Sequence, residues 1–179
     1  MMVAMTLVTG LTAVAAVTDL RWHKIYNWLT YPGMLVALLV AFGPPWWNVS
    51  SGWEDCLQGW AVCGGLMVTA FLLFPSMGGG DVKLIAMQGA YLGVERGVLA
   101  MLWTFVFAAV AALAIVVWRV GAWRLLREGF GQLVWLVKTG RPRPLAPSER
   151  AVLQPALPLA AAALPAVLVV CFDLERWLW

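Results

Sequence analysis

The chain has 179 residues, of which 63% are hydrophobic and 12% are charged, and its mean hydropathy is +0.84. Soluble domains are about 45–50% apolar and about 25% charged, so this composition excludes an ordinary soluble protein. The length allows about six spans of ~20 residues. We therefore predict an all-α bundle of six transmembrane helices that forms a single domain over residues 1–179. The lipid bilayer is its expected surrounding, and no nucleic acid partner is expected.

Apolar runs separated by charged residues, glycine or proline predict the six helices. The fourth predicted helix is too short to cross a hydrocarbon layer ~30 Å thick by itself. We therefore expect one of its ends to lie in a protein-lined, water-accessible cavity. In chain order the predicted helices are Met1–Thr18, Trp28–Gly43, Cys56–Pro75, Val82–Gly93, Val98–Val120 and Ala151–Phe172.

Basic residues are concentrated in every second connection between the predicted helices. Residues 19–27, 76–83 and 119–150 hold all of the 12 Lys and Arg except Arg96 and Arg176. Such connections stay on the cytoplasmic side of a membrane. The charge pattern therefore predicts a multi-pass membrane protein with both termini external.

The connection 119–150 contains apolar residues at helical spacing beside basic ones. This pattern favours an amphipathic helix lying at the cytoplasmic face of the membrane. A solvated charged loop that happens to contain aromatic residues is the alternative interpretation. The apolar residues are Trp123, Leu126, Phe130, Leu133 and Val137.

Two carboxylates interrupt the apolar pattern. Asp19 follows the first predicted helix, and Asp81 follows the glycine run Gly78, Gly79 and Gly80. An acid at the centre of a bilayer costs about 3 kcal/mol, so an intramembrane aspartate is a candidate functional residue. The alternative is a purely structural role, in which Asp19 ends one helix at the interface and Asp81 caps another.

Two adjacent carboxyl groups that share one proton can hydrolyse a peptide bond. One group activates a water as a base, and the other protonates the leaving group. The residues do not indicate whether Asp19 or Asp81 is the base. We expect the glycines before Asp81 to allow positive φ and close approach of an extended substrate, which would pair through backbone hydrogen bonds.

Three neighbouring residues have two interpretations each. Lys83 either interacts electrostatically with the acids or extends its charge to the cytoplasmic interface. Arg21 either anchors the topology or is a neighbour of the acids. Asn27 is most simply the N-cap of the second helix, and a role in the site is the alternative.

We predict no metal and no organic cofactor. The three cysteines, Cys56, Cys63 and Cys171, contain no CxxC spacing, and we expect them to be small buried thiols. The acidic residues of the connections that we place outside are expected to be solvated loop charges. These are Glu54, Asp55, Asp173 and Glu175.

The motifs around the two acids carry a family resemblance. Gly78-Gly79-Gly80-Asp81-Val82-Lys83-Leu84 resembles the GxGDxK signature of type IV prepilin peptidases, which are GxGD intramembrane aspartic proteases. Asp19-Leu20-Arg21, followed by Ile25, Asn27 and Thr30, resembles the first aspartate motif of the same family. The order of the motifs and the six-helix layout match over essentially the whole chain.

The resemblance implies an aspartic endopeptidase in which Asp19 and Asp81 are catalytic. It also implies a place in the bacterial inner membrane. Its substrates would be pilin-like precursors, whose basic leader is removed on the cytoplasmic side just before a hydrophobic helix. Long family members carry an additional cysteine-containing cytoplasmic domain and N-methylate the new terminus. This chain resembles the short type of Tad/Flp pili and archaeal preflagellin peptidases, so we expect no methyltransferase activity.

One residue departs from the family pattern, because Tyr26 stands where proline usually precedes the asparagine. Two other functions stay open from the residues alone. Paired intramembrane acids also relay protons, as in a proton-coupled carrier or channel component. An inactive subunit of pilus assembly would keep the same fold. The oligomeric state is left open as well.

Overall fold

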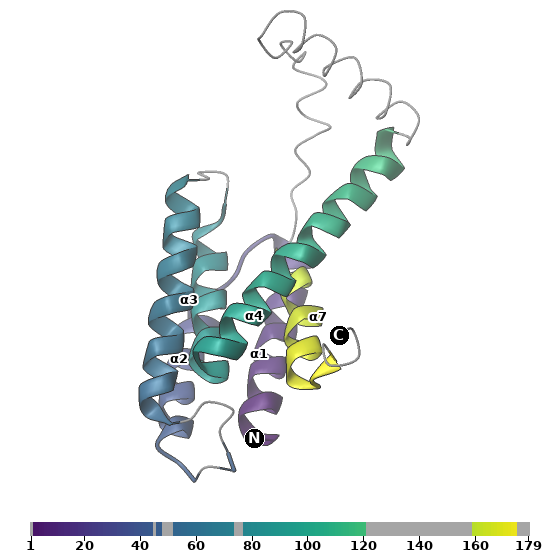
Figure 1. Ribbon diagram of the computed structural model, residues 1–179. Coiled ribbons are helices and arrows are strands. Elements are labelled where there is room, and N and C mark those ends of the chain that lie inside the picture. The colour runs from purple at the N-terminus through teal and green to yellow at the C-terminus, as the bar shows by residue number, and fades with distance from the viewer. Residues whose placement is uncertain (1, 45, 48–51, 74–76, 121–158, 175–179) are drawn as a thin grey trace, which may run out of the picture. The chain divides into compact units, whose positions relative to one another are not determined.

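The computed structural model describes residues 2–44, 46–47, 52–73, 77–120 and 159–174, and Figure 1 shows the helices that they form. The chain divides into two compact units, one of residues 1–107 and 158–179 and the other of residues 108–157. The predicted amphipathic helix at 123–137 and the predicted start of the sixth helix at 151–158 lie outside the described residues. The helices are α1 (Met2–Trp22), α2 (Asn27–Ala41), α3 (Trp53–Leu73), α4 (Gly79–Val120) and α7 (Leu159–Cys171).

The predicted all-α class is confirmed, since every regular element among the described residues is a helix. Helix α1 continues past Thr18, where we expected it to end, and includes Asp19. It ends where His23 adopts a left-handed φ of 50° and donates its backbone N–H to the Asp19 carbonyl over 2.8 Å. A charged residue alone does not end a helix, whereas a left-handed residue does.

Helix α4 is broken at Gly93, which has φ 77° and ψ −173°. The sequence prediction that a helix ends at Gly93 is confirmed, but the expected connection at 94–97 is helical. The second segment begins directly at Val94 because the Asp55 carboxylate accepts a hydrogen bond from its backbone N–H, at 3.1 Å. An acceptor supplied by another helix thus takes the place of a local N-cap.

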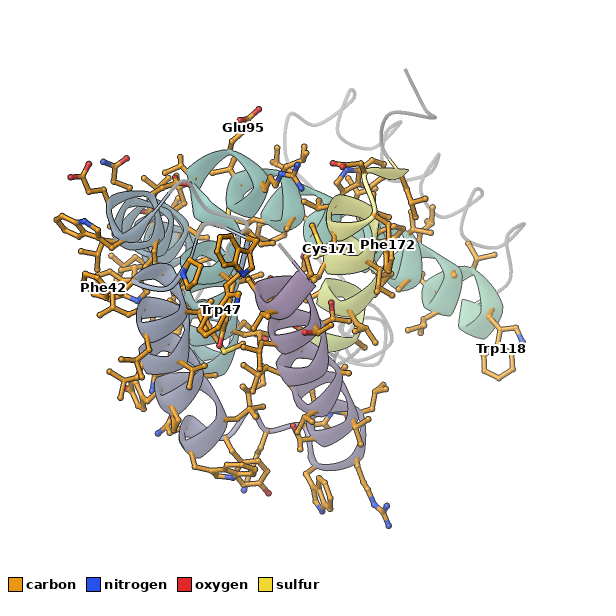
Figure 2. All side chains as sticks on the ribbon, turned by 90° about the horizontal axis from the view of Figure 1, so that it is seen from below. Phe42, Trp47, Glu95, Trp118, Cys171 and Phe172 are labelled. Atoms are coloured by element: carbon orange, nitrogen blue, oxygen red, sulfur yellow. The ribbon has the colours of Figure 1, made fainter. Side chains whose placement is uncertain are left out.

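Three helices are long and apolar enough to cross a membrane: Val3–Trp22, Trp53–Leu73 and Gly79–Trp118. Helices α2 and α7, with 15 and 13 residues, are apolar but shorter than a ~30 Å hydrocarbon layer requires. The predicted six transmembrane spans are therefore not confirmed. Large apolar side chains nevertheless face outward, and Leu39 and Leu72 are 70% and 73% exposed. Figure 2 shows Phe42 on the outer side, as a lipid-facing surface requires.

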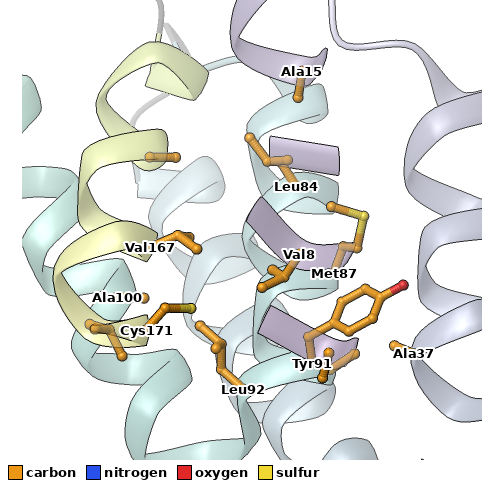
Figure 3. Close-up of a cluster of buried hydrophobic side chains, with 14 of the residues drawn as sticks. Val8, Ala15, Ala37, Leu84, Met87, Tyr91, Leu92, Ala100, Val167 and Cys171 are labelled. Atoms are coloured by element: carbon orange, nitrogen blue, oxygen red, sulfur yellow. The ribbon is translucent and has the colours of Figure 1, made fainter. Parts of the chain in front are cut away.

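The core of the first unit joins α1, α2, α4 and α7. Helix α7 lies along α1 (Figure 1), and their small side chains allow a close approach. Figure 3 shows part of this core, in which Val8 of α1, Tyr91 of α4 and Val167 of α7 are all at most 2% exposed. The backbones of α3 and α4 meet at Gly59 and Gly89, where an added Cβ on either residue would overlap the other helix. This packing places the end of α1 and the start of α4 beside the start of α2.

Candidate active site

A cavity of about 390 Å³ lies at the end of the first unit where α1 ends and where α2 and α4 begin. Both predicted acids line it, and they therefore open toward the same end of the first unit. The cavity is formed largely by the connection between α1 and α2 and by glycines at the start of α4. Its lining residues are Asp19, His23, Lys24, Ile25, Tyr26, Asn27, Gly78, Gly80 and Asp81.

Asp19 is held by the start of α7. Asp19 is only 8% exposed, and its Oδ2 accepts a hydrogen bond from the backbone N–H of Ala160 at 3.2 Å. Ala160 lies in the first turn of α7, where backbone N–H groups have no partner within the helix. The carboxylate satisfies one of these donors and lies at the positive end of the helix dipole.

Asp81 lies in the first turn of α4 and is partly buried. Its backbone N–H donates to the Gly78 carbonyl over 3.1 Å, which begins the helix. The Asp19 and Asp81 carboxyl groups are close enough to interact electrostatically. Two helix N-termini, those of α4 and α7, therefore meet at one pair of acids, and both stabilise negative charge there.

The glycine run before Asp81 has a different role from the one expected. Positive φ among the described glycines occurs at Gly52 and Gly93, so the expected positive φ at Gly78–Gly80 is wrong. Gly79 and Gly80 instead form the first turn of α4. A Cβ added at Gly80 would lie only 2.9 Å from the Cβ of Ile25, whereas Gly79 has open space around it. Gly80 thus leaves room for the Ile25 side chain, and the expected approach of a substrate to these glycines stays a prediction.

Lys83 and Asn27 join the starts of α4 and α2. The Lys83 Nζ donates a hydrogen bond to the Asn27 Oδ1 over 2.9 Å and lies 4.9 Å from the centre of the Tyr31 ring. The prediction that Asn27 caps α2 is wrong. The N-cap position is Tyr26, which makes no side-chain cap hydrogen bond, and Asn27 is the first residue of the helix. Its side chain is directed to Lys83 because α4 supplies a charged donor.

The remaining predicted site residue, Arg21, is exposed and does not line the cavity. Its guanidinium carbon lies 5.3 Å from the centre of the Trp22 ring. The cavity contains four residues that the sequence interpretation did not place there, namely His23, Lys24, Ile25 and Tyr26. Their position in the chain between Asp19 and Asn27 could have indicated that they line the cavity, because a connection between two site residues tends to run beside the site.

The opposite end of the first unit contains acids with structural contacts. Asp55, which we expected to be a solvated loop charge, lies in the first turn of α3 and caps Val94. The same expectation is wrong for Asp173, whose Oδ1 lies 3.5 Å from the Arg96 Nη2. Glu54 also lies in the first turn of α3, while Glu175 is outside the described residues.

The cysteines are buried as predicted, with 2%, 0% and 6% exposure for Cys56, Cys63 and Cys171. Within the described ranges, no group of three or more His, Cys, Asp or Glu side chains is arranged to hold a metal ion. Asp19 and Asp81 contribute two carboxyl groups to the cavity, which His23 and Lys24 also line.

A family model described as the type IV leader peptidase family matches residues 6–113, which is more than half of the chain and includes both acids. The chain belongs to the type IV leader peptidase family. No curated protein and no solved structure matches it. Family membership together with the three long apolar helices identifies a membrane peptidase, and it implies a pilin-like precursor as the substrate.

Proposed function

We propose that this leader peptidase is an intramembrane aspartic endopeptidase in which Asp19 and Asp81 are the catalytic pair. The observation that carries the proposal is the shared cavity, in which the two acids interact and each lies at a helix N-terminus. The Gly78–Gly80 run, Lys83 and Asn27 support the site, and Arg21 anchors the topology. The whole chain, residues 1–179, would be one membrane-embedded peptidase domain that needs no cofactor.

The proposed reaction adds water across one amide bond. The ionised carboxylate takes a proton from the water while the water oxygen bonds to the carbonyl carbon. The protonated carboxyl group of the other aspartate then gives its proton to the amide nitrogen, the C–N bond breaks, and the leader leaves with a new carboxyl group. The pair gains one proton from the water and gives one to the leaving nitrogen, so it holds a single proton before and after the reaction, with the two aspartates in exchanged protonation states.

The proposed orientation places the cavity at the cytoplasmic face of the inner membrane, where a basic leader would be removed. Arg21, Lys24 and Lys83 all lie at the cavity end of the first unit, in keeping with the tendency of basic residues to stay inside. Labelling with a membrane-impermeant thiol reagent tests the orientation. Lys24→Cys should react only after the membrane is opened, whereas Glu95→Cys, exposed near the break in α4 (Figure 2), should react in intact cells.

Co-expression with candidate pilin-like precursors tests the activity. We expect the parent chain to release the leader, and Asp19→Asn and Asp81→Asn to leave the precursor intact while being inserted at the parent level. Mass spectrometry of the product gives the cleavage position and shows whether the new N-terminus carries a methyl group, which we expect to be absent. A proton-coupled carrier would yield no cleaved product, and an inactive assembly subunit would behave like both variants; either result overturns the proposal.

A further inference from the structure

The structure contains a buried polar contact that the proposed chemistry does not use. Gln88 of α4 is 1% exposed, Thr12 of α1 is 0% exposed, and the Gln88 Nε2 donates a hydrogen bond to the Thr12 Oγ1 over 3.2 Å. The Gln88 Oε1 has no hydrogen-bond partner within the described residues. A buried amide with one unpartnered oxygen is unfavourable for stability, so packing alone does not explain why a glutamine occupies this position.

The contact is placed symmetrically with respect to the acids. Thr12 precedes Asp19 by seven positions on α1, and Gln88 follows Asp81 by seven positions on α4. Seven residues are about two helical turns, so each polar residue lies below the acid on the same face of its helix. Helix α1 runs toward the cavity and α4 runs away from it. The hydrogen bond therefore lies two turns below the acid pair, between the same two helices.

Apolar side chains occupy other levels of the core that α1 and α4 share. These apolar residues include Ala15 and Leu84 at one level and Val8 and Leu92 at another (Figure 3). Apolar contacts are non-directional, whereas a hydrogen bond in a low-dielectric interior has a defined partner. In lipid, an apolar helix interface gains no hydrophobic preference for one register over another.

We propose that Gln88 and Thr12 are positioning residues that set the register of α1 against α4 and so hold the carboxyl groups of Asp19 and Asp81 opposite each other. This inference rests on the proposed function, because it assigns the contact a role in the same reaction. A slip of one helical turn moves an acid by about 5.4 Å. A misplacement of only about 1 Å can reduce catalysis about 100-fold.

Kinetic measurements on purified peptidase with a cleavable precursor test the role in catalysis. Thr12→Val and Gln88→Met keep the side-chain volume and remove the hydrogen bond, and we expect each to lower kcat about 10- to 100-fold with little change in KM. The double variant should be no worse than either single variant, since both remove the same contact. Thr12→Ser keeps the hydroxyl group and should retain the parent kcat.

Thr104→Val is the matched control. Thr104 is also buried, at 1% exposure, but its Oγ1 donates to the Ala100 carbonyl within its own helix over 2.7 Å. The control makes the same chemical change away from the α1–α4 contact, and it should keep the parent kcat. Thermal unfolding of Gln88→Met should be at or above the parent temperature, because the unpartnered Oε1 is removed. A parent-like kcat for Thr12→Val, or a fall in kcat equal to that of Thr104→Val, overturns the inference.

Cysteine cross-linking reports the register without any substrate. In a background with the three native cysteines replaced, the Ala15→Cys and Leu84→Cys pair should form a disulfide on oxidation, and adding Gln88→Met should reduce its yield. An unchanged yield of the disulfide overturns the inference that Gln88 sets the register. If the parent chain cleaves no precursor, the proposed function fails and the catalytic role of the contact fails with it. A fall in cross-linking then still shows that Gln88 sets the register, so the two failures are distinguishable.

Discussion

The Asp19 Oδ2 accepts a hydrogen bond from the Ala160 backbone N–H at 3.2 Å, and this contact joins the end of α1 to the beginning of α7, 141 positions later in the chain. The contact gives Asp19 two separable properties. Its acid is one half of the proposed catalytic pair, and its oxygen is an acceptor for a buried backbone donor. Substitutions at this position can therefore separate chemistry from stability.

We predict that Asp19→Asn and Asp19→Ala both abolish leader removal but differ in stability. The asparagine keeps an oxygen that can accept from the Ala160 N–H, whereas the alanine leaves this donor buried without a partner, at a cost of about 1–3 kcal/mol. Thermal unfolding in detergent should show a lower midpoint for Asp19→Ala than for Asp19→Asn. Equal midpoints would contradict the structural role of the contact.

A second prediction concerns Lys83, whose Nζ contacts Asn27 and the Tyr31 ring. If its role is to hold the start of α2, Lys83→Met and Asn27→Ala should each slow cleavage by less than about tenfold, because exposed polar contacts of this kind contribute up to about 1 kcal/mol. The double variant should be no slower than the worse single variant. Initial cleavage rates at saturating precursor measure the effect.

Lys83→Arg provides the conservative control, since it keeps a cation that can donate to Asn27 and lie over Tyr31. A different pattern would place Lys83 with the acids instead. In that case Lys83→Met would be as inactive as Asp81→Asn, while Asn27→Ala would cleave at the parent rate.

The sequence predicted the pair of acids because the alternation of helices brings Asp19 and Asp81 to the same end of the bundle. It also predicted the end of a helix at Gly93, since glycine accepts the positive φ found there. These features depend on local composition and on whether an even or odd number of helices separates two residues. Both are readable from a single chain.

The contacts of Asp19 with Ala160, of Lys83 with Asn27 and of Asp55 with Val94 were not predictable in the same way. Each joins two helices, and the hydrophobic periodicity of the sequence does not show how one helix is aligned along another. Asn27 illustrates the difficulty, because asparagine before an apolar run is a typical N-cap. In the structure a lysine from another helix provides a stronger, charged partner, and Asn27 takes the first helical position instead.

A third prediction separates two neighbouring glycines in the first turn of α4. Gly79→Ala should cleave normally, because the space around Gly79 is open and alanine favours the helix. Gly80→Ala should slow cleavage, since its Cβ would press against the Cβ of Ile25 and displace the turn that carries Asp81. Gly80→Val should abolish cleavage without preventing insertion. Leader removal in cells, normalised to the amount of inserted peptidase, measures all three, and normal processing by Gly80→Val would count against the prediction.

The last prediction concerns the break in α4, which lies away from the cavity. Gly93 has φ 77°, and an added Cβ would lie 2.8 Å from the Asp55 carboxyl carbon. Gly93→Ala should therefore destabilise the fold by at least about 1 kcal/mol, through backbone strain and through displacement of the carboxylate that caps Val94. The midpoint of thermal unfolding should fall by several degrees.

Gly65→Ala is the matched control for this change, because Gly65 lies inside α3 with no atom near the added Cβ. Alanine is favoured over glycine by about 1 kcal/mol in a helix, so this variant should be as stable as the parent or more stable. Asp55→Ala should resemble Gly93→Ala, because either change removes the acceptor of the Val94 N–H. If Gly93→Ala instead unfolds at the temperature of Gly65→Ala, α4 does not need its break at this residue, and the second helical segment is stabilised by packing alone.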